Sequence, residues 1–278
     1  MSYGSARRVW VCSLFVCVSV CAHRPNPYSH RTGPRRIRNC IHSSQAPNFR
    51  EHTRTMRTFA VLWLASLSCT ALTVIEHTMH QQHRPPPRMP HAEVPARLEA
   101  AKAALLGSAF AHKLSWRSTA ELEQDLGVVE AALQRVHSAE LIESIKQLST
   151  RGGGVDSDTY VAPGSWEAIL DGTSSWLEAT TLAAKGAGPA LALARPPGHH
   201  ATRNVAMGFC LANFAAAAAA DFLARHPSRT IAILDWDVHH GNGVADILAN
   251  EPRARYYRCR HLYRVRTTQT RSLTLTPM

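Results

Sequence analysis

The sequence predicts an α/β fold in which helices flank a parallel β-sheet. Between residues 72 and 250, short apolar runs alternate with longer segments whose apolar residues recur at helical spacing. Hydrophobic residues make up 45% of the 278 residues and charged residues 18%, so the chain can bury a core and is not globally disordered. The clearest unit spans residues 190–234, where two apolar runs enclose an alanine-rich segment.

The first part of this region contains one expected strand and one expected helix. Residues 73–75 form a short apolar run that is consistent with a strand. The proline-rich segment 85–90 is expected to be a loop, because proline lacks the amide hydrogen that helices and sheets use. Residues 98–105 place apolar side chains on one helical face, and Gly107 follows as a terminator.

Two more helices are expected before the central unit. Residues 141–148 carry apolar side chains at helical spacing, and Ser138 is suited to cap that helix. The three glycines at 152–154 indicate a loop. Residues 165–177 repeat the helical spacing, with Trp166 on the apolar face.

The central unit predicts two parallel strands joined by one helix. Residues 190–194 read as a buried strand and are followed by a loop at 195–197. Residues 209–225 are rich in alanine and favour a helix, and a second buried strand is expected at 231–234. Such a crossover connects parallel strands, so the loops after both strands open at the same edge of the sheet. Ligands of open α/β sheets bind at that edge.

The net charge of +11 does not indicate a nucleic-acid-binding protein, because it comes from the two ends of the chain. Residues 1–71 contain ten arginines and one acidic residue, a net charge of +9, and residues 251–278 contain seven arginines and one acidic residue, a net charge of +6. Residues 72–250 therefore carry −4. We expect no direct contact with nucleic acid, and contact with a membrane only during targeting. Cysteine follows the same distribution, and Cys210 is the one cysteine of the middle region.

The first 71 residues have the composition of a targeting segment. Two arginines precede an apolar run at residues 9–18 and small residues at 19–22, which is the layout of a secretory signal peptide. Residues 23–57 are rich in Arg, Ser and His and resemble an organellar transit peptide. A second start-like unit begins at Met56 and is followed by another apolar run, at 59–72, too short to favour a transmembrane helix.

Two interpretations of this segment stay open. A signal-plus-transit presequence implies entry into a plastid, another organelle or the secretory pathway. A true translation start at Met56 or later implies the nucleus or the cytoplasm. In both cases residues 1–71 are expected to be mostly disordered.

The other end, residues 251–278, has arginine at nearly every second position from Arg253 onward. This pattern fits neither a buried strand nor an amphipathic helix. A shifted reading frame or intron read-through would produce such a pattern, and a genuine basic tail is the alternative. The predicted organisation is therefore a leader (1–71), a folded region (72–250) and a basic tail (251–278).

The loops after the two central strands carry most of the reactive side chains. In an extended segment Asp235, Asp237 and His239 point to one side, and a divalent metal is a suitable partner for such a crowded set. His199 and His200 come from the facing loop and have the chemistry of a general base and its electrostatic partner beside a metal-bound water.

Asp235 and Asn242 are suitable acceptors to orient those two imidazoles. Each motif alone has an ordinary structural explanation, such as a solvent-facing His-His pair or an Asp turn. The combination of two histidine-rich loops at one sheet edge favours a metal hydrolase over structural polar loops. The glycines at 241 and 243 do not complete a dinucleotide-binding fingerprint.

Three motifs together resemble the histone deacetylase superfamily. They are RPPGHHA (195–201), MGFCLAN (207–213) and AILDWDVHHGNGVADI (232–247). The match is to the class II-like branch, which includes bacterial and plastid deacetylases and acetylpolyamine amidohydrolases. Weaker similarity extends upstream to HAEVPARL (91–98), so the resemblance covers residues 73–248. It implies an arginase/deacetylase-like three-layer fold.

The resemblance also implies roles for individual residues. Asp237 and His239 match two of three Zn²⁺ ligands, and His199 and His200 match the catalytic pair with Asp235 and Asn242 as partners. Among substrate-binding residues, Gly208 and Phe209 match the wall of a narrow acyl-lysine channel, and Asp158 matches an acid at its rim. The backbone carbonyls of Asp235, Asp237 and His239 match a structural K⁺ site.

The chain also departs from the family pattern. The third zinc ligand of the family is an aspartate further downstream, and no acidic residue follows Glu251 here. The glycine-rich loop and the tyrosine that polarises the substrate carbonyl are absent as well, and Tyr256 and Tyr257 lie too early to replace that tyrosine. Phe214 stands where the family usually has a second asparagine. The domain is therefore expected to lack its C-terminal part, and this chain to be inactive or unstable.

The leading hypothesis is a zinc-dependent deacetylase-family protein that hydrolyses acetyl-lysine-type amides of histones, other proteins or polyamines with metal-activated water. The alternative is a non-catalytic binding or scaffold protein that keeps the deacetylase fold. An arginase-type dinuclear enzyme ranks last, because it needs further Asp and His ligands that the sequence does not offer downstream.

Overall fold

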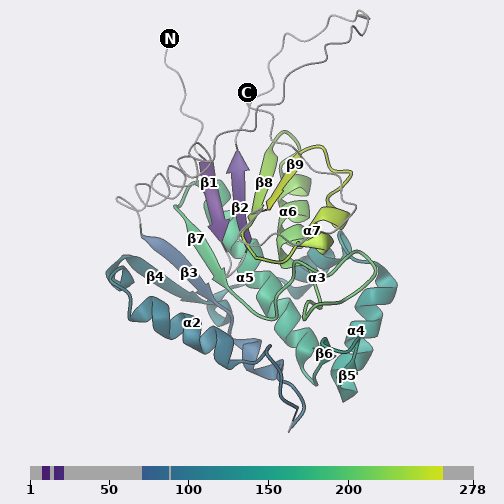
Figure 1. Cartoon of the computed structure of the whole chain (residues 1–278). Helices are drawn as coiled ribbons and strands as arrows, with labels where there is room; N and C mark the ends of the chain where they lie inside the picture. Colours follow the sequence, from purple (N-terminus) through teal and green to yellow (C-terminus); the bar gives the residue numbers. More distant parts are fainter. Residues whose placement is uncertain (1–7, 13–15, 22–70, 88, 259–278) are drawn as a thin grey trace, which may run out of the picture.

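The computed structural model describes residues 8–12, 16–21, 71–87 and 89–258, and it confirms a largely parallel sheet flanked by helices (Figure 1). The strands of the main sheet are β1 (Arg8–Cys12), β2 (Val16–Cys21), β3 (Leu72–Glu76), β4 (Leu114–Ser118), β7 (Ala190–Leu193), β8 (Thr230–Asp235) and β9 (Ala254–Arg258). A second, two-stranded sheet consists of β5 (Gly153–Gly154) and β6 (Tyr160–Val161).

Six α-helices are described, together with three short 3-10 helices. The α-helices are α2 (Ala96–Leu106), α3 (Leu126–Gln134), α4 (Ala139–Arg151), α5 (Ser165–Lys185), α6 (Phe214–Arg225) and α7 (Asn242–Ile247). The 3-10 helices are η1 (Met79–Gln82), η2 (Ala111–Lys113) and η3 (Thr119–Glu121). Among the described residues, no helix is long and apolar enough to cross a membrane.

The strand order of the main sheet is β4-β3-β7-β1-β2-β8-β9. All pairs are parallel except those of β2, which runs antiparallel to both β1 and β8. β7 and β8 therefore point the same way, as predicted, although two strands lie between them. Their carboxyl ends meet the same edge of the sheet, and this places the two histidine-rich loops together.

Apolar side chains on successive residues of the strands explain why helices cover both faces of the sheet. Ile75 is fully buried in the larger core cluster, which α3, α4, α5 and α6 line, while its neighbour Val74 belongs to a second cluster with Leu98 of α2. Successive side chains of a strand face opposite sides. A strand that is apolar on both sides requires cover on both sides, which a parallel sheet obtains from its crossover helices. Figure 1 shows α5 and α6 on one face of the sheet.

The alanine-rich helix α6 packs closely because its side chains are short. The residues at positions 216–219 are all alanine and fully buried. The helix starts at Phe214 rather than at 209 as the composition predicts, since the side chain of Asn213 accepts a hydrogen bond from the Ala216 amide (3.1 Å) and caps it there. The segment 209–213 is left free to form a loop beside the histidines.

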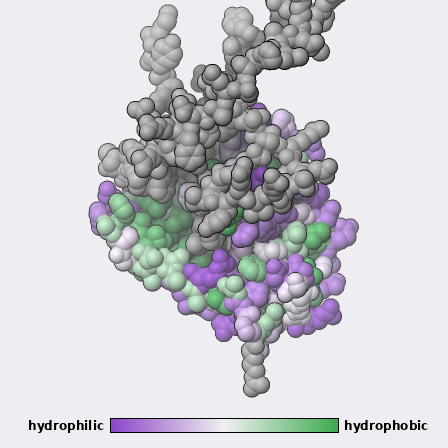
Figure 2. Space-filling model, viewed as in Figure 1, coloured by the Kyte–Doolittle hydropathy of each residue, from purple (hydrophilic) through white to green (hydrophobic). Residues whose placement is uncertain are grey.

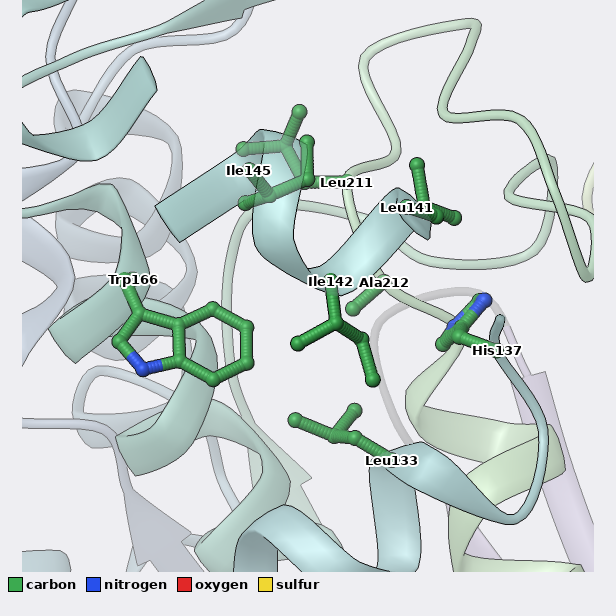
Figure 3. Close-up of a pocket in the computed structure, with 8 residues that line it drawn as sticks. All are labelled: Leu133, His137, Leu141, Ile142, Ile145, Trp166, Leu211 and Ala212. Carbon is green, nitrogen blue, oxygen red and sulfur yellow. The ribbon is translucent and has the colours of Figure 1, made fainter. Parts of the chain in front are cut away.

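A small cavity lies within the core. It has a volume of about 10 Å³, lies between α3, α4 and the start of α5 (Figure 3), and is lined by Leu133, His137, Leu141, Ile142, Ile145, Trp166, Leu211 and Ala212. Both ring nitrogens of His137 already have partners, the Thr202 carbonyl and the Asn213 amide. The remaining lining is apolar, so the cavity is a packing gap and not a binding site.

The surface divides into two regions in the view of Figure 2. Hydrophobic side chains gather on the left, over β3, β4 and α2, whereas hydrophilic ones predominate at the lower right, around α4. The acidic and basic side chains of the folded region are interspersed, for example in the pairs Lys146–Glu130 and Arg117–Glu178. This agrees with a weakly charged body.

The described chain ends in a strand at the edge of the sheet. Residues 254–258 form this strand, β9, parallel to β8, although the arginine-rich pattern indicates neither a buried strand nor an amphipathic helix. The physical reason is that an edge strand tolerates charged side chains on its open side. Ala254 is buried and Arg255 exposed, as alternation requires. The predicted frameshift beyond residue 258 lies outside the described residues.

The start of the chain holds two strands of the sheet. β1 and β2 belong to the segment predicted to be a presequence, and β2 pairs with β8 over six residue positions. The predictions for residues 1–7, 13–15 and 22–70 lie outside the described residues. The presequence, its disorder and the later translation start stay predictions.

Deleting residues 1–22 tests whether the sheet needs β1 and β2. We expect the deletion to abolish cooperative unfolding in urea, because β7 and β8 each lose one of their two neighbouring strands and each lost hydrogen bond costs about 0.5–1.5 kcal/mol. Deleting residues 1–7 alone removes no described strand and is the matched control. An unchanged unfolding midpoint in the longer deletion would contradict the strand pairing.

Two buried histidines predict how stability depends on pH. Burial, with the nearby Arg195 and His91, lowers the pKa of His83 to about 3, and burial lowers the pKa of His137 to about 4. The unfolded chain binds these protons near pH 6.5, so stability is complete above that pH and falls toward pH 4 by about 1.4 kcal/mol per unit for each group.

The measurement is the urea midpoint at pH 7 and at pH 4.5. We expect His137→Gln, which retains hydrogen-bonding groups, to reduce the difference between the two midpoints. His112→Gln, at an exposed position, is the control and should leave the difference unchanged. Equal pH dependence in His137→Gln and the parent chain would show that His137 is not held neutral.

Candidate active site

The loops after β7 and β8 meet at the carboxyl edge of the sheet and are hydrogen-bonded to each other. The Gly243 amide donates to the His199 carbonyl (3.0 Å). A Cβ on Gly198 would lie 2.7 Å from the Ala212 carbonyl oxygen and 3.0 Å from the Phe214 amide nitrogen, so only glycine fits there. The glycines of both motifs thus let the loops approach each other closely.

Asp235, at the end of β8, is fully buried and holds His199 in place. Its Oδ2 accepts hydrogen bonds from His199 Nδ1 (3.0 Å) and Tyr256 Oη (2.8 Å), and its Oδ1 accepts one from the Asp237 amide (3.1 Å). An ionised carboxylate only accepts hydrogen bonds, so His199 carries its proton on Nδ1. Nε2 of His199 is thereby left able to accept a proton.

His200 forms a second, parallel pair with Asn242. His200 Nδ1 lies 2.6 Å from Asn242 Oδ1, and the Asn242 side-chain amide donates to the His200 carbonyl (3.3 Å). The rings of His199 and His200 are 4.1 Å apart between centroids. Burial and the nearby His199 and His239 lower the pKa of His200, against the opposing effect of Asn242, so the neutral imidazole predominates at neutral pH.

Asp237 and His239 lie together beside these pairs. Asp237 Oδ1 is 3.0 Å from His239 Nδ1, and the His239 side chain is 72% exposed. The carboxylate oxygen and the imidazole nitrogen are hydrogen-bonded to each other here, and both are ligand types that Zn²⁺ binds in proteins. Within the described residues, however, no three His, Cys, Asp or Glu side chains converge on a metal site. The described residues therefore fit two of the three protein ligands that a catalytic zinc needs.

The expectation that Asp235, Asp237 and His239 all point to one side is only partly met. Asp235 is directed to His199, and the other two contact each other. Asp235 therefore orients His199, whereas Asp237 and His239 are the residues whose side chains suit a metal.

Gly208 and Phe209 lie against the histidine pair. Both have positive φ angles, 58° and 68°. A Cβ on Gly208 would lie 2.7 Å from His200 Cδ2, so the glycine allows the backbone to pack on the imidazole. Phe209 is the one described non-glycine residue with positive φ, a strained conformation often found at functional sites.

Asp158 is joined to this wall through its backbone. The Asp158 carbonyl accepts a hydrogen bond from His91 Nε2 (3.1 Å), and the His91 ring lies edge-on to Phe209, with centroids 5.0 Å apart. The Phe209 amide donates to Thr159 Oγ1 (3.0 Å). A chain of contacts thus runs from the exposed Asp158 through His91 to Phe209, whose neighbour Gly208 lies against His200.

The sequence did not assign a role to Arg195 or Glu93, which anchor the loop after β7. Arg195 and Glu93 are buried, and Arg195 Nε lies 2.8 Å from Glu93 Oε1. The guanidinium group also donates to the carbonyls of His80 and His83. Both residues stood in motifs of the resemblance, but 102 positions separate them and no local pattern links them. Tyr256 was likewise missed as a partner of Asp235.

Comparison with known proteins identifies the family. Residues 91–263, more than half of the chain, match the histone deacetylase domain. The chain belongs to this family. The resemblance drawn from the three motifs is therefore confirmed.

Two relatives illustrate the extent of the match. The deacetylase-family chain is 40% identical over 167 residues to an uncharacterised protein of Synechocystis sp., covering 60% of this chain and 54% of that protein. It is also 40% identical over 169 residues to the histone deacetylase-like amidohydrolase of Pseudomonas aeruginosa, covering 59% and 42%. The chain spans about half the length of these curated relatives.

Solved structures support the same fold. The crystal structure of the HDA15 HD domain superposes with a TM-score of 0.58 at 29% identity, covering 68% of this chain and 53% of that one. The acetylpolyamine aminohydrolase from Burkholderia pseudomallei superposes with a TM-score of 0.57 at 26% identity, covering 68% and 63%.

Replacing Glu93 by Gln tests the anchor of the histidine loop. The variant leaves the buried guanidinium of Arg195 without its counter-charge, so we expect a loss of about 3–5 kcal/mol in the free energy of unfolding. Glu130→Gln breaks the half-exposed pair with Lys146 and should cost less than about 1 kcal/mol. Equal losses, measured by urea unfolding, would contradict the importance of the buried pair.

Proposed function

We propose that this deacetylase-family domain, once a third zinc ligand completes its site, hydrolyses acetyl-lysine-type amides in a zinc-dependent reaction. The observation that carries the proposal is the pair of histidine dyads, His199–Asp235 and His200–Asn242, side by side at the sheet edge and next to Asp237 and His239. Family membership supports the hydrolase class.

Asp237 and His239 would hold the zinc together with a third ligand outside the described residues. When bound, zinc lowers the pKa of a water molecule to near neutrality and polarises the substrate carbonyl. The chemistry of the described residues follows from their hydrogen bonds. His199 accepts the proton of the attacking water at Nε2, because Asp235 fixes its other nitrogen as the donor. The same proton is then available for the leaving amine.

His200 has a different task. Its lowered pKa keeps it neutral beside His199, so the two imidazoles do not repel each other as cations before a proton is taken up. Gly208 and Phe209 shape the approach to the dyads, and the exposed Asp158 suits the rim, where it can accept hydrogen bonds from substrate backbone amides.

The substrate is an acetylated amine in a protein or a polyamine. Support for this choice comes from the relatives, which include the acetylpolyamine amidohydrolase of Mycoplana ramosa, 45% identical over 91 residues, and histone deacetylase 5 of Arabidopsis thaliana, 36% identical over 144 residues. A role in chromatin regulation would follow only if the acetylated protein is a histone.

The competing function is a binding or scaffold protein that keeps the fold without catalysis. It is favoured by one observation, that the described residues supply two metal ligands and not three. The hydrolase requires bound zinc, whereas the binding or scaffold protein does not.

The test compares the 278-residue chain with a chimera in which residues 1–258 are followed by the corresponding C-terminal part of the Synechocystis relative. We expect the chimera to bind one zinc and to cleave a fluorogenic acetyl-lysine peptide, and the 278-residue chain to show little or no turnover. In the chimera, His199→Ala should lower kcat by about 10²–10⁴-fold, while His112→Ala, far from the site in sequence and exposed, should not. A folded chimera without zinc or turnover would favour the scaffold.

A further inference from the structure

Tyr256 of β9 is in contact with the proposed catalytic machinery through a hydrogen bond to Asp235. Its Oη lies 2.8 Å from Asp235 Oδ2, the same oxygen that accepts from His199 Nδ1 at 3.0 Å. The parallel register of β8 and β9, with Ile233 opposite Tyr256, places the ring beside the end of β8. The contact joins the edge strand to the loop that carries the histidines.

Asp235 Oδ2, Tyr256 Oη and His199 Nδ1 converge beside Gly241. A Cβ at this position would overlap Asp235 Oδ2 and lie 2.6 Å from Tyr256 Oη and 3.1 Å from His199 Nδ1. The glycine backbone therefore closes over the shared carboxylate oxygen, and Asp235 is fully buried there. A buried carboxylate oxygen with two donors has no need of water, and its position is fixed by both donors.

We propose that Tyr256 is a positioning residue that sets the strength and direction of the Asp235–His199 hydrogen bond. This inference rests on the proposed role of His199 as the base. Two donors share the lone pairs of Oδ2, so each weakens the acceptor for the other. Removing the tyrosine hydroxyl concentrates the carboxylate charge on the imidazole, while the Asp237 amide still holds Oδ1 of Asp235.

The Tyr256 hydroxyl remains a hydrogen-bond donor at neutral pH. Burial, followed by the charge of Asp235, raises the pKa of Tyr256, so the phenol is not ionised at neutral pH. A purely structural role, in which the hydroxyl only satisfies a buried acceptor, predicts a loss of stability on its removal and no change at His199.

The experiment records the His199 Nδ1 proton by NMR in the 278-residue chain, which does not depend on turnover. We expect Tyr256→Phe to shift this resonance downfield, because the remaining hydrogen bond to Asp235 is stronger. Tyr257→Phe is the matched control, since its side chain is on the other face of β9 and 38% exposed, and it should leave the resonance unchanged. No shift in Tyr256→Phe, or equal shifts in both variants, would overturn the proposal.

A second measurement covers the case in which Tyr256→Phe does not fold. Incorporation of 3-fluorotyrosine at position 256 preserves the ring and makes the phenol a stronger donor, so the His199 proton should move upfield. An unchanged or downfield resonance contradicts the proposal.

In the zinc-binding chimera, Tyr256→Phe should lower kcat about tenfold with KM unchanged, because the residue acts on the base and not on the substrate. A change in KM alone would contradict a positioning role. A shifted His199 resonance in a chimera without turnover would retain the positioning role and reject the proposed function.

Discussion

The buried carboxylate of Asp235 is the interaction on which the candidate site depends. It lies at the end of β8 and receives hydrogen bonds from the loop after β7, from the edge strand β9 and from its own loop. Without these donors a fully buried carboxylate would cost several kcal/mol. Because the partners come from three separate segments, the site can form only when the sheet edge is assembled.

The sheet makes that convergence possible. β7 and β8 run parallel and present their loops at one edge, even though β1 and β2 lie between them. The buried Arg195–Glu93 pair then fixes the start of the histidine loop against the segment before α2. The fold and the site thus depend on the same buried, paired charges. Removing one partner leaves the other charge buried and unpaired, which lowers the stability of the folded chain.

The residues of the two loops could be predicted from the sequence because the relevant rules are local. Parallel strands and their periodicity place His199 and His200 opposite Asp235 and Asn242, and the structure brings these four together. Contacts such as Arg195–Glu93 depend on how distant segments pack, which no local pattern encodes. Tyr256 lies too early in the sequence to replace the carbonyl-polarising tyrosine of the family. Its hydrogen bond to Asp235 depends on the position of β9 beside β8, which no local pattern predicts.

The elements that the sequence missed are those with weak periodicity. None of the residues of β4 is fully buried, α3 exposes the apolar Leu126 and Val128, and β9 contains two arginines, so none of the three shows a clear hydrophobic period. The start of α6 was placed too early because alanine composition says little about where a cap lies. Tertiary packing decides in such segments, so local propensity is a poor guide.

The central claim is a division of labour in which Asp235 orients His199 while Asp237 and His239 suit the metal. The most direct measurement is an anomalous difference map at the zinc edge from crystals of the chimera grown with Zn²⁺. We expect a peak beside Asp237 and His239, with Asp235 still hydrogen-bonded to His199. A peak bonded to Asp235, or none near Asp237 and His239, would contradict it.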